Sequence, residues 1–330
     1  MRISVLDQSP VLEGSSPSHA IKATIELAVA AEQLGYNRFW LAEHHNMRGL
    51  ANPCPEILLS AIGHHTKKMR IGTGGILLPY YSPLKVAETF NMLETLFPKR
   101  IDLGIGRAPG GDRLTANALN PNAFNDANAF PNQVVETLQW LDGSIPKQHP
   151  FGEIKAMPTS TTSPEVWLLG SSNYSSTLAS HLGLPFAFAH FISAEGGEEA
   201  SNLYRQNYTE TETGNKPYNM VCVSAICAKT EKEAEVLAGP LDHRRLQLAT
   251  GSETTLQTTS KAKLNEYTDH EKHIIEKNRV RSIIGTPASV NEDLVELVEA
   301  FNADELMILT MTGDYESRIT SYELIAKTFN

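Results

Sequence analysis

The sequence predicts a (β/α)8 barrel, an α/β fold in which eight parallel strands alternate with helices. Short apolar runs alternate with longer amphipathic segments along the whole chain of 330 residues. Eight of the short runs have the length and composition of buried strands. An open doubly wound sheet is the competing architecture. Because no internal repeat or change of composition marks a boundary, we expect residues 1–330 to form one barrel domain, with insertions in the loops at the carboxyl ends of the strands.

The first half of the chain supplies four strands and three helices. A helix follows the first strand, with Ser18 as its N-cap and Gly35 as its stop. The next two helices are expected over residues 55–65 and 83–97, and Pro83 stands near a first-turn position where proline loses no helical hydrogen bond. The four strands are expected at residues 3–6, 38–41, 69–76 and 101–105.

The second half resumes the alternation after a long connection. Residues 108–130 are rich in Asn, Gly, Pro and Ala, which predicts an extended segment before a helix over residues 133–141. One last helix is expected at residues 315–329. The other four strands, with helices between them, are expected at residues 166–169, 186–189, 220–227 and 305–309. Eight strands are the number that a closed barrel requires.

Residues 250–278 break the alternation, because they are almost wholly Ser, Thr, Gln, Lys, Glu and Asp with few apolar anchors. Such a composition predicts a mobile insertion. Two interpretations remain open for it. One is an exposed helix with a frayed connection, and the other is a lid over the active site.

Composition and charge exclude several classes of protein. The formal net charge of −10 disfavours a broad surface for nucleic acid or anionic membrane. Asp7 comes too early for a secretory apolar region, and no apolar stretch approaches the ~20 residues of a membrane span. The cysteines, Cys54, Cys222 and Cys227, are odd in number and unevenly spaced. We therefore expect reduced thiols in a cytoplasmic protein.

Glycine occurs at three of the predicted strand ends, and in a barrel the loops at these ends form the active site. The segments concerned are residues 72–75, 104–106 and 170. Glycine removes side chains where a flat ligand would lie against backbone, so the pattern suits an aromatic ring system. Gly104 and Gly106 do not form a dinucleotide fingerprint, because Gly110 comes one residue too late and Pro109 lies inside the turn.

Three hydroxyls, those of Ser171, Ser172 and Ser175, lie where a helix begins after the fifth strand. A helix start supplies unpaired N–H groups and a positive dipole end, so this cluster predicts a phosphate site. A single capping serine would explain one hydroxyl and not the cluster. Arg107 is a second phosphate candidate, because its guanidinium offers forked donors to phosphate oxygens. A surface ion pair is its alternative.

Two histidines follow the second strand beside an acid. His44 and His45 stand next to Glu43, but adjacent residues leaving a strand point to opposite sides, and the sequence holds no second metal-binding motif. A histidine at a strand end in a pocket is better suited to move protons, because its ordinary pKa is close to working pH. A purely structural histidine is the alternative for either one.

Several motifs in order resemble those of the bacterial luciferase-like flavin monooxygenases, and within them the luciferase-family oxidoreductases of unassigned substrate. They begin near Asp7-Gln8-Ser9-Pro10 and end near Ala303-Asp304-Glu305-Leu306-Met307, so the resemblance covers nearly the whole chain. Between these ends it rests on four motifs, which are Ala-Glu-His-His at 42–45, Gly-Thr-Gly-Gly-Ile-Leu-Leu-Pro at 72–79, Arg-Ile-Asp-Leu-Gly-Ile-Gly-Arg at 100–107 and Gly-Leu-Pro at 183–185.

The resemblance implies an enzyme that binds reduced FMN, supplied by a separate NAD(P)H-dependent reductase, and uses dioxygen to oxygenate a small organic substrate. It places the catalytic histidine on His44 and a neighbouring active-site acid on Glu43. It places a non-proline cis peptide that lies against the flavin between Gly74 and Gly75. A homo-oligomer, with a dimer favoured, is also expected. The flavin phosphate contacts fall on Arg107, Ser172 and Ser175, with Ser171 beside them.

Two positions depart from the family pattern. Gly106 replaces the reactive cysteine of luciferase, and His190 replaces an aromatic flavin neighbour. We therefore do not expect light emission from a long-chain aldehyde. Three other functions remain as alternatives. They are hydride transfer with a deazaflavin, flavin binding without catalysis, and a metal-dependent barrel hydrolase, for which the sequence offers no three convergent ligands.

Overall fold

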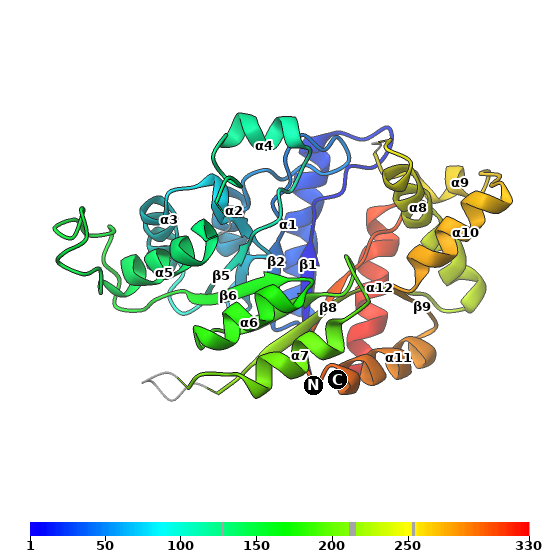
Figure 1. The fold of residues 1–330 in the computed structure, drawn as a ribbon. Coiled ribbons are helices and arrows are strands. Elements are labelled where there is room, and N and C mark those ends of the chain that lie inside the picture. Colours follow the sequence, from blue (N-terminus) through cyan, green and yellow to red (C-terminus); the bar gives the residue numbers. More distant parts are fainter. Residues whose placement is uncertain (127, 211–215, 253–254, 330) are drawn as a thin grey trace.

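A computed structural model describes residues 1–126, 128–210, 216–252 and 255–329. Its parallel strands form a closed ring with helices outside it (Figure 1). The ring closes because the last strand pairs on one side with the first strand and on the other with the strand that begins at Asn219. The (β/α)8 prediction is confirmed. In ring order the strands are β1 (Arg2–Asp7), β2 (Arg38–Leu41), β3 (Arg70–Thr73), β5 (Ile101–Gly106), β6 (Glu165–Gly170), β7 (Phe186–Ala189), β8 (Asn219–Cys227) and β10 (Glu305–Leu309).

Helices connect successive ring strands and bury one face against them. Both chain termini lie at the amino end of the ring, opposite α4 (Figure 1). Within the described ranges, no helix is both long and apolar enough to cross a bilayer. The helices are α1 (Pro17–Gln33), α2 (Pro55–His65), the 3-10 turn η1 (Leu78–Tyr80), α3 (Pro83–Leu96), α4 (Arg113–Leu119), α5 (Ala129–Asp142), α6 (Asn173–His181), α7 (Gly197–Gln206), α8 (Glu231–Ala249), α9 (Thr259–Ala262), α10 (Asp269–Arg279), α11 (Pro287–Ala300) and α12 (Tyr315–Phe329).

The ring strands match the eight predicted strands, and two short strands differ from the prediction. The third predicted strand is divided, because β3 ends before Gly74 and the pairing resumes in β4 (Ile76–Leu77), which joins β5. The other is β9 (Ser282–Gly285), which pairs only with the last four residues of β8. Its run of two isoleucines is too short to stand out from the surrounding polar sequence.

Two helix starts and one connection also differ from the prediction. Ser16, and not Ser18, caps α1, since the Ser16 hydroxyl accepts a hydrogen bond from the His19 backbone N–H at 3.2 Å. The segment predicted to be extended contains α4, whose first turn is capped by Asp112. The helix expected at residue 133 begins four residues earlier, at Ala129.

The polar segment 250–278 contains an apolar anchor that its composition conceals. Leu256 is fully buried, and its backbone pairs with Val11 and Glu13 in the loop after β1. The two helices α9 and α10 follow, and Thr268 and Glu271 form a capping box at the start of α10. The described part of this segment is therefore tied to the loop after β1, through Leu256 and through an ion pair between Lys261 and Glu13.

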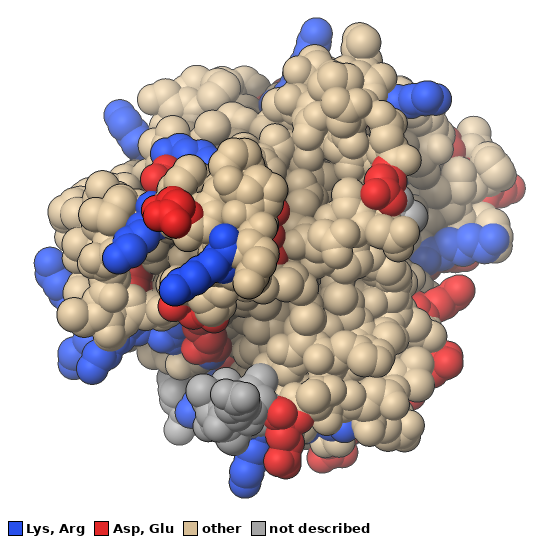
Figure 2. All heavy atoms as spheres, turned by 60° about the vertical axis from the view of Figure 1, so that its left-hand side comes forward, with Lys and Arg blue, Asp and Glu red and all other residues tan. Residues whose placement is uncertain are grey.

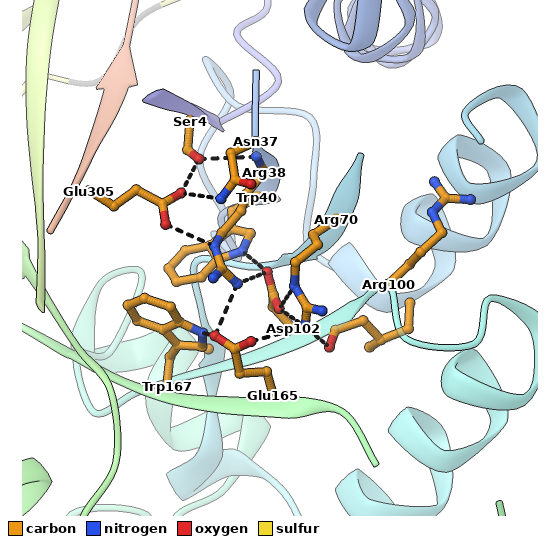
Figure 3. Close-up of polar contacts among 12 residues, drawn as sticks. Ser4, Asn37, Arg38, Trp40, Arg70, Arg100, Asp102, Glu165, Trp167 and Glu305 are labelled. Atoms are coloured by element: carbon orange, nitrogen blue, oxygen red, sulfur yellow. Dashed lines mark hydrogen bonds and ion pairs between the residues drawn. The ribbon is translucent and has the colours of Figure 1, made fainter. Parts of the chain in front are cut away.

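The amino end of the barrel is closed by a network of buried charges (Figure 3). The Arg38 guanidinium lies 2.9 Å from Asp102, 3.2 Å from Glu305 and 3.1 Å from Glu165. The indoles of Trp40 and Trp167 pack edge to face above this network, with ring centroids 5.2 Å apart, and their N–H groups donate to Asp102 and Glu165, respectively. This layer forms a floor, so space inside the barrel opens only at the carboxyl end.

Charges on the outer surface are mixed in sign. Figure 2 shows basic and acidic side chains scattered around the margin of one face, with neither sign forming a continuous field across its centre. This distribution agrees with the acidic net charge of the sequence.

Candidate active site

A cavity of about 420 Å³ opens at the carboxyl end of the barrel. Every ring strand, or the residues directly after it, contributes to the lining, and Trp40 lies at the bottom. The volume is within the range of small-molecule and cofactor sites. Eight of the nine predicted site residues line it, namely Glu43, His44, Gly74, Gly75, Arg107, Ser171, Ser172 and Ser175.

His44 leaves β2 and brings a neutral imidazole to the wall of the cavity. Burial, followed by the positive charges of Arg244 and His45, lowers its pKa from 6.5 to about 4. Its Nδ1 atom is buried and has no hydrogen-bond partner among the described residues. A neutral imidazole with a buried, unpartnered nitrogen can exchange a proton with a bound molecule.

Glu43 is engaged by the protein itself. Its carboxylate accepts hydrogen bonds from His45 Nε2 at 2.7 Å, from the Tyr81 hydroxyl at 2.7 Å and from the Leu77 backbone N–H at 3.0 Å. Burial, together with this carboxylate, raises the pKa of Tyr81. Glu43 therefore holds the loop after β3 against the loop after β2, and its part in catalysis stays a prediction.

The peptide bond between Gly74 and Gly75 is cis, and both residues lie in the cavity wall. A Cβ added to Gly75 would come within 2.6 Å of the Gly104 carbonyl oxygen, and one added to Gly74 within 2.7 Å of a Leu6 methyl. Any larger residue would collide with the barrel behind the wall. The cavity therefore has a wall of bare backbone at this point, which fits a flat ring.

The predicted phosphate site lies at the start of α6. Ser172 is the N-cap residue, but its side chain makes no capping hydrogen bond, and Ser175 follows in the first turn and is buried. The exposed Arg107 guanidinium stacks over the ring of Tyr174 at 4.1 Å. A guanidinium placed over an aromatic face keeps its N–H groups, which lie in its own plane, available to an anion. Tyr174 was missed by sequence reasoning, although it stands among the serines.

His190, predicted to be a flavin neighbour, is not among the residues that line the cavity, and its contact with a cofactor stays a prediction. Its imidazole is 8% exposed and packs edge to face on Phe301, outside the ring. Burial, followed by the positive charges of Arg245 and Arg281, lowers its pKa to about 4. The next residue, Phe191, lines the cavity instead, since adjacent residues at a strand end point to opposite sides.

Sequence reasoning also missed Arg244, which α8 contributes to the cavity lining and which is 5% exposed. A residue in a helix gives no sign of facing a barrel site until the packing of that helix is known. Within the described ranges, His, Cys, Asp and Glu side chains form no group of three or more that could hold a metal ion.

These features together fit a flavin-type cofactor that carries a phosphate group. The bare backbone of Gly74 and Gly75 suits the ring, and the serines with Arg107 at the start of α6 suit the phosphate. The buried nitrogen of His44 offers a proton-exchanging group in the same cavity.

Relatives of known sequence agree with this geometry. A family model described as luciferase-like monooxygenase matches residues 1–304. YceB of Bacillus subtilis (strain 168) is 41% identical over 329 residues, which is 100% of this chain and 99% of the relative. A luciferase-like monooxygenase of Escherichia coli (strain K12) is 37% identical and covers 97% of this chain and 95% of its own length. N-acetyl-S-alkylcysteine monooxygenase of Bacillus subtilis (strain 168) is 32% identical, with coverages of 99% and 97%.

Solved structures share the barrel. Apo-MsnO8 superposes with a TM-score of 0.89 at 34% identity, covering 99% of this chain and 97% of its own. Two others show the fold alone. The oxygenating constituent of 3,6-diketocamphane monooxygenase from Pseudomonas putida, in complex with FMN, has a TM-score of 0.76 at 20% identity, with coverages of 99% and 97%. An F420-dependent secondary alcohol dehydrogenase has a TM-score of 0.71 at 13% identity, with coverages of 100% and 99%. With a family match over most of its length and full-length relatives above 30% identity, this chain belongs to the luciferase-like monooxygenase family.

Proposed function

We propose that this enzyme uses reduced FMN and dioxygen to oxygenate a small organic substrate. The observation that carries the proposal is the cluster of Arg107, Ser172 and Ser175 at the start of α6, in one cavity with His44. In this proposal the cluster holds the phosphate, and the backbone of Gly74 and Gly75 supports the ring. We also propose that a separate NAD(P)H-dependent reductase supplies the reduced FMN and that the enzyme is a homodimer.

Bound reduced FMN would supply the electrons that activate dioxygen, while the protein supplies position and shielding. His44 takes and returns a proton at its imidazole nitrogen, because burial keeps the ring neutral above a pKa of about 4. Glu43 keeps the loop after β3 in place through the Leu77 N–H. The indole of Trp40 closes the bottom of the cavity and keeps water from entering through the floor.

FMN is preferred to a deazaflavin because the relative named for monooxygenation is 32% identical, whereas the F420-dependent neighbour is 13% identical. N-acetyl-S-alkylcysteine monooxygenase is named for a thioether substrate. Thioethers are therefore the first substrate class to screen. N-acetyl-S-methylcysteine is a suitable small member of that class.

The test compares cofactors directly. The purified protein is titrated with FMN and with F420, and binding is followed by cofactor fluorescence. Oxygen uptake is then measured after anaerobically reduced FMN is mixed with the protein and a thioether panel. We expect FMN to bind and oxygen to be consumed with product formation. Tighter binding of F420, with no oxygen incorporated into any product, would overturn the proposal in favour of hydride transfer.

A further inference from the structure

The cavity holds a second arginine, well separated around the ring from the predicted phosphate site. Arg107 follows β5, whereas Arg244 lies on α8 after β8, three strands further around the ring. Arg244 and Leu248 both line the cavity and are four residues apart, so one face of α8 looks into it. Arg245 turns the other way and donates to the Asn278 carbonyl and the Ser282 hydroxyl.

The charge of Arg244 influences the part of the cavity where His44 lies. Both residues line the same space, and after burial the positive charge of Arg244 is the largest influence that lowers the pKa of His44. Arg107 is not among the groups that shift this pKa. The two arginines therefore serve different parts of the cavity. One lies beside the serines of α6, and the other lies beside the proton-exchanging imidazole.

The surroundings of Arg244 favour an organic anion. The cavity wall is largely apolar and includes Met47, Leu248 and Phe191. A guanidinium that is 5% exposed gains most from a partner that also carries charge. Arg244 already makes interactions within the folded chain. A guanidinium has five N–H donors, so one guanidinium can hold a planar carboxylate and keep contacts with the chain at the same time.

We propose that Arg244 binds the carboxylate of the substrate, so that the enzyme oxygenates small organic acids with an apolar, oxidisable part. The proposal rests on the monooxygenase function proposed above, and it names the class of substrate for the same site. The apolar wall would hold the oxidisable part, and Arg244 would fix its orientation relative to His44. Arg244 is in this sense a specificity-determining residue.

The test compares acids with neutral molecules of the same shape. The probes are N-acetyl-S-methylcysteine, N-acetylmethionine and hexanoate, each paired with its primary amide. Binding is measured by calorimetry on the protein with and without oxidised FMN. The variants are Arg244→Gln, Arg244→Lys and the surface control Arg48→Gln, since Arg48 is exposed on the loop after β2. FMN affinity is measured separately for each protein.

We expect at least one acid to bind the unmodified protein roughly tenfold or more tightly than its amide. Arg244→Gln should remove this preference while leaving amide and FMN affinity within about threefold, and Arg244→Lys should retain part of it. Arg48→Gln should behave like the unmodified protein. The proposal is overturned if no acid binds better than its amide, or if Arg244→Gln weakens both to the same extent. Failure of FMN to bind would count against the proposed function instead, because the acid–amide comparison is also made without FMN.

Discussion

Buried polar groups are paired with one another at the amino end of the barrel, whereas one at the carboxyl end has no partner. At the floor, Arg38 is surrounded by three carboxylates (Figure 3). Burial lowers its pKa, but Asp102, Glu305 and Glu165 outweigh that effect, so its pKa is raised. At the mouth, among the described residues, the buried His44 Nδ1 atom has no hydrogen-bond partner. Polar groups satisfied by the chain itself indicate stability, whereas those that are not indicate a ligand.

The largest expected effect on stability is at the floor. Arg38→Met leaves Asp102 and Glu305 buried without their shared cation, so we expect the free energy of unfolding to fall by ~3–5 kcal/mol. Urea unfolding measures it, and Lys85→Met, at an exposed lysine of α3, is the control. FMN affinity of the folded fraction should not change. A loss below about 1 kcal/mol would mean that the network does not stabilise the barrel.

At the mouth, His44→Ala should leave stability and FMN affinity unchanged and lower turnover ~100-fold or more, because it removes the proton-exchanging group. Stopped-flow oxidation of reduced FMN in the presence of substrate gives the rate. His45→Ala is the matched comparison, since His45 Nε2 is bonded to Glu43. If His44→Ala turns over normally and His45→Ala does not, the catalytic assignment moves by one residue.

In the predicted phosphate site, loss of the charged Arg107 side chain should weaken FMN binding more than loss of the neutral Ser172 hydroxyl. Arg107→Ala should weaken FMN binding by ~1.5–3 kcal/mol, or roughly 10–150-fold, and Ser172→Ala by about 1 kcal/mol, or roughly fivefold. Flavin fluorescence titration measures both. Equal affinity in both variants and the unmodified protein would place the phosphate elsewhere in the cavity.

Acid should destabilise the protein through its buried histidines. Burial, followed by neighbouring arginines, lowers the pKa values of His44 and His190 from 6.5 to about 4. Between these pH values the unfolded chain binds protons that the folded chain does not, so stability is present above pH 6.5 and is lost as the pH falls towards 4. Urea unfolding at about pH 7 and about pH 5 measures the loss. His190→Phe should reduce it, and His270→Asn, at an exposed histidine of α10, should not.

The smallest effect concerns the segment 250–278, for which mobility remains a prediction. We expect protease to cut first in this segment, and Leu264, 80% exposed between α9 and α10, is the favoured position. Bound FMN should slow the cut if the segment is a lid. Mass spectrometry of the first fragments locates the first cleavage site. First cleavage in another loop, or no protection by FMN, would leave the segment as a connection held by Leu256.

The sequence was sufficient for the eight ring strands, because each is an apolar run set between polar segments. It was not sufficient for β9 or α4, whose short runs gain their order from neighbours, namely β8 for the first and the Asp112 cap for the second. In the site, residues directly after strands were found, since the fold alone brings them together. Arg244 was missed because the orientation of α8 depends on packing. Phe191 was missed because successive side chains at a strand end point to opposite sides, so that Phe191 and not His190 lines the cavity.

The pair of indoles at the floor also gives the molecule an optical property. Trp40 lies in the cavity lining and touches Trp167, whereas the third tryptophan, Trp140, packs outside the ring on α5. An aromatic ring system seated above Trp40 would accept excitation energy from both floor indoles. The emission of the floor indoles would then fall, so the chain's own fluorescence would report whether the cavity is filled, without any label.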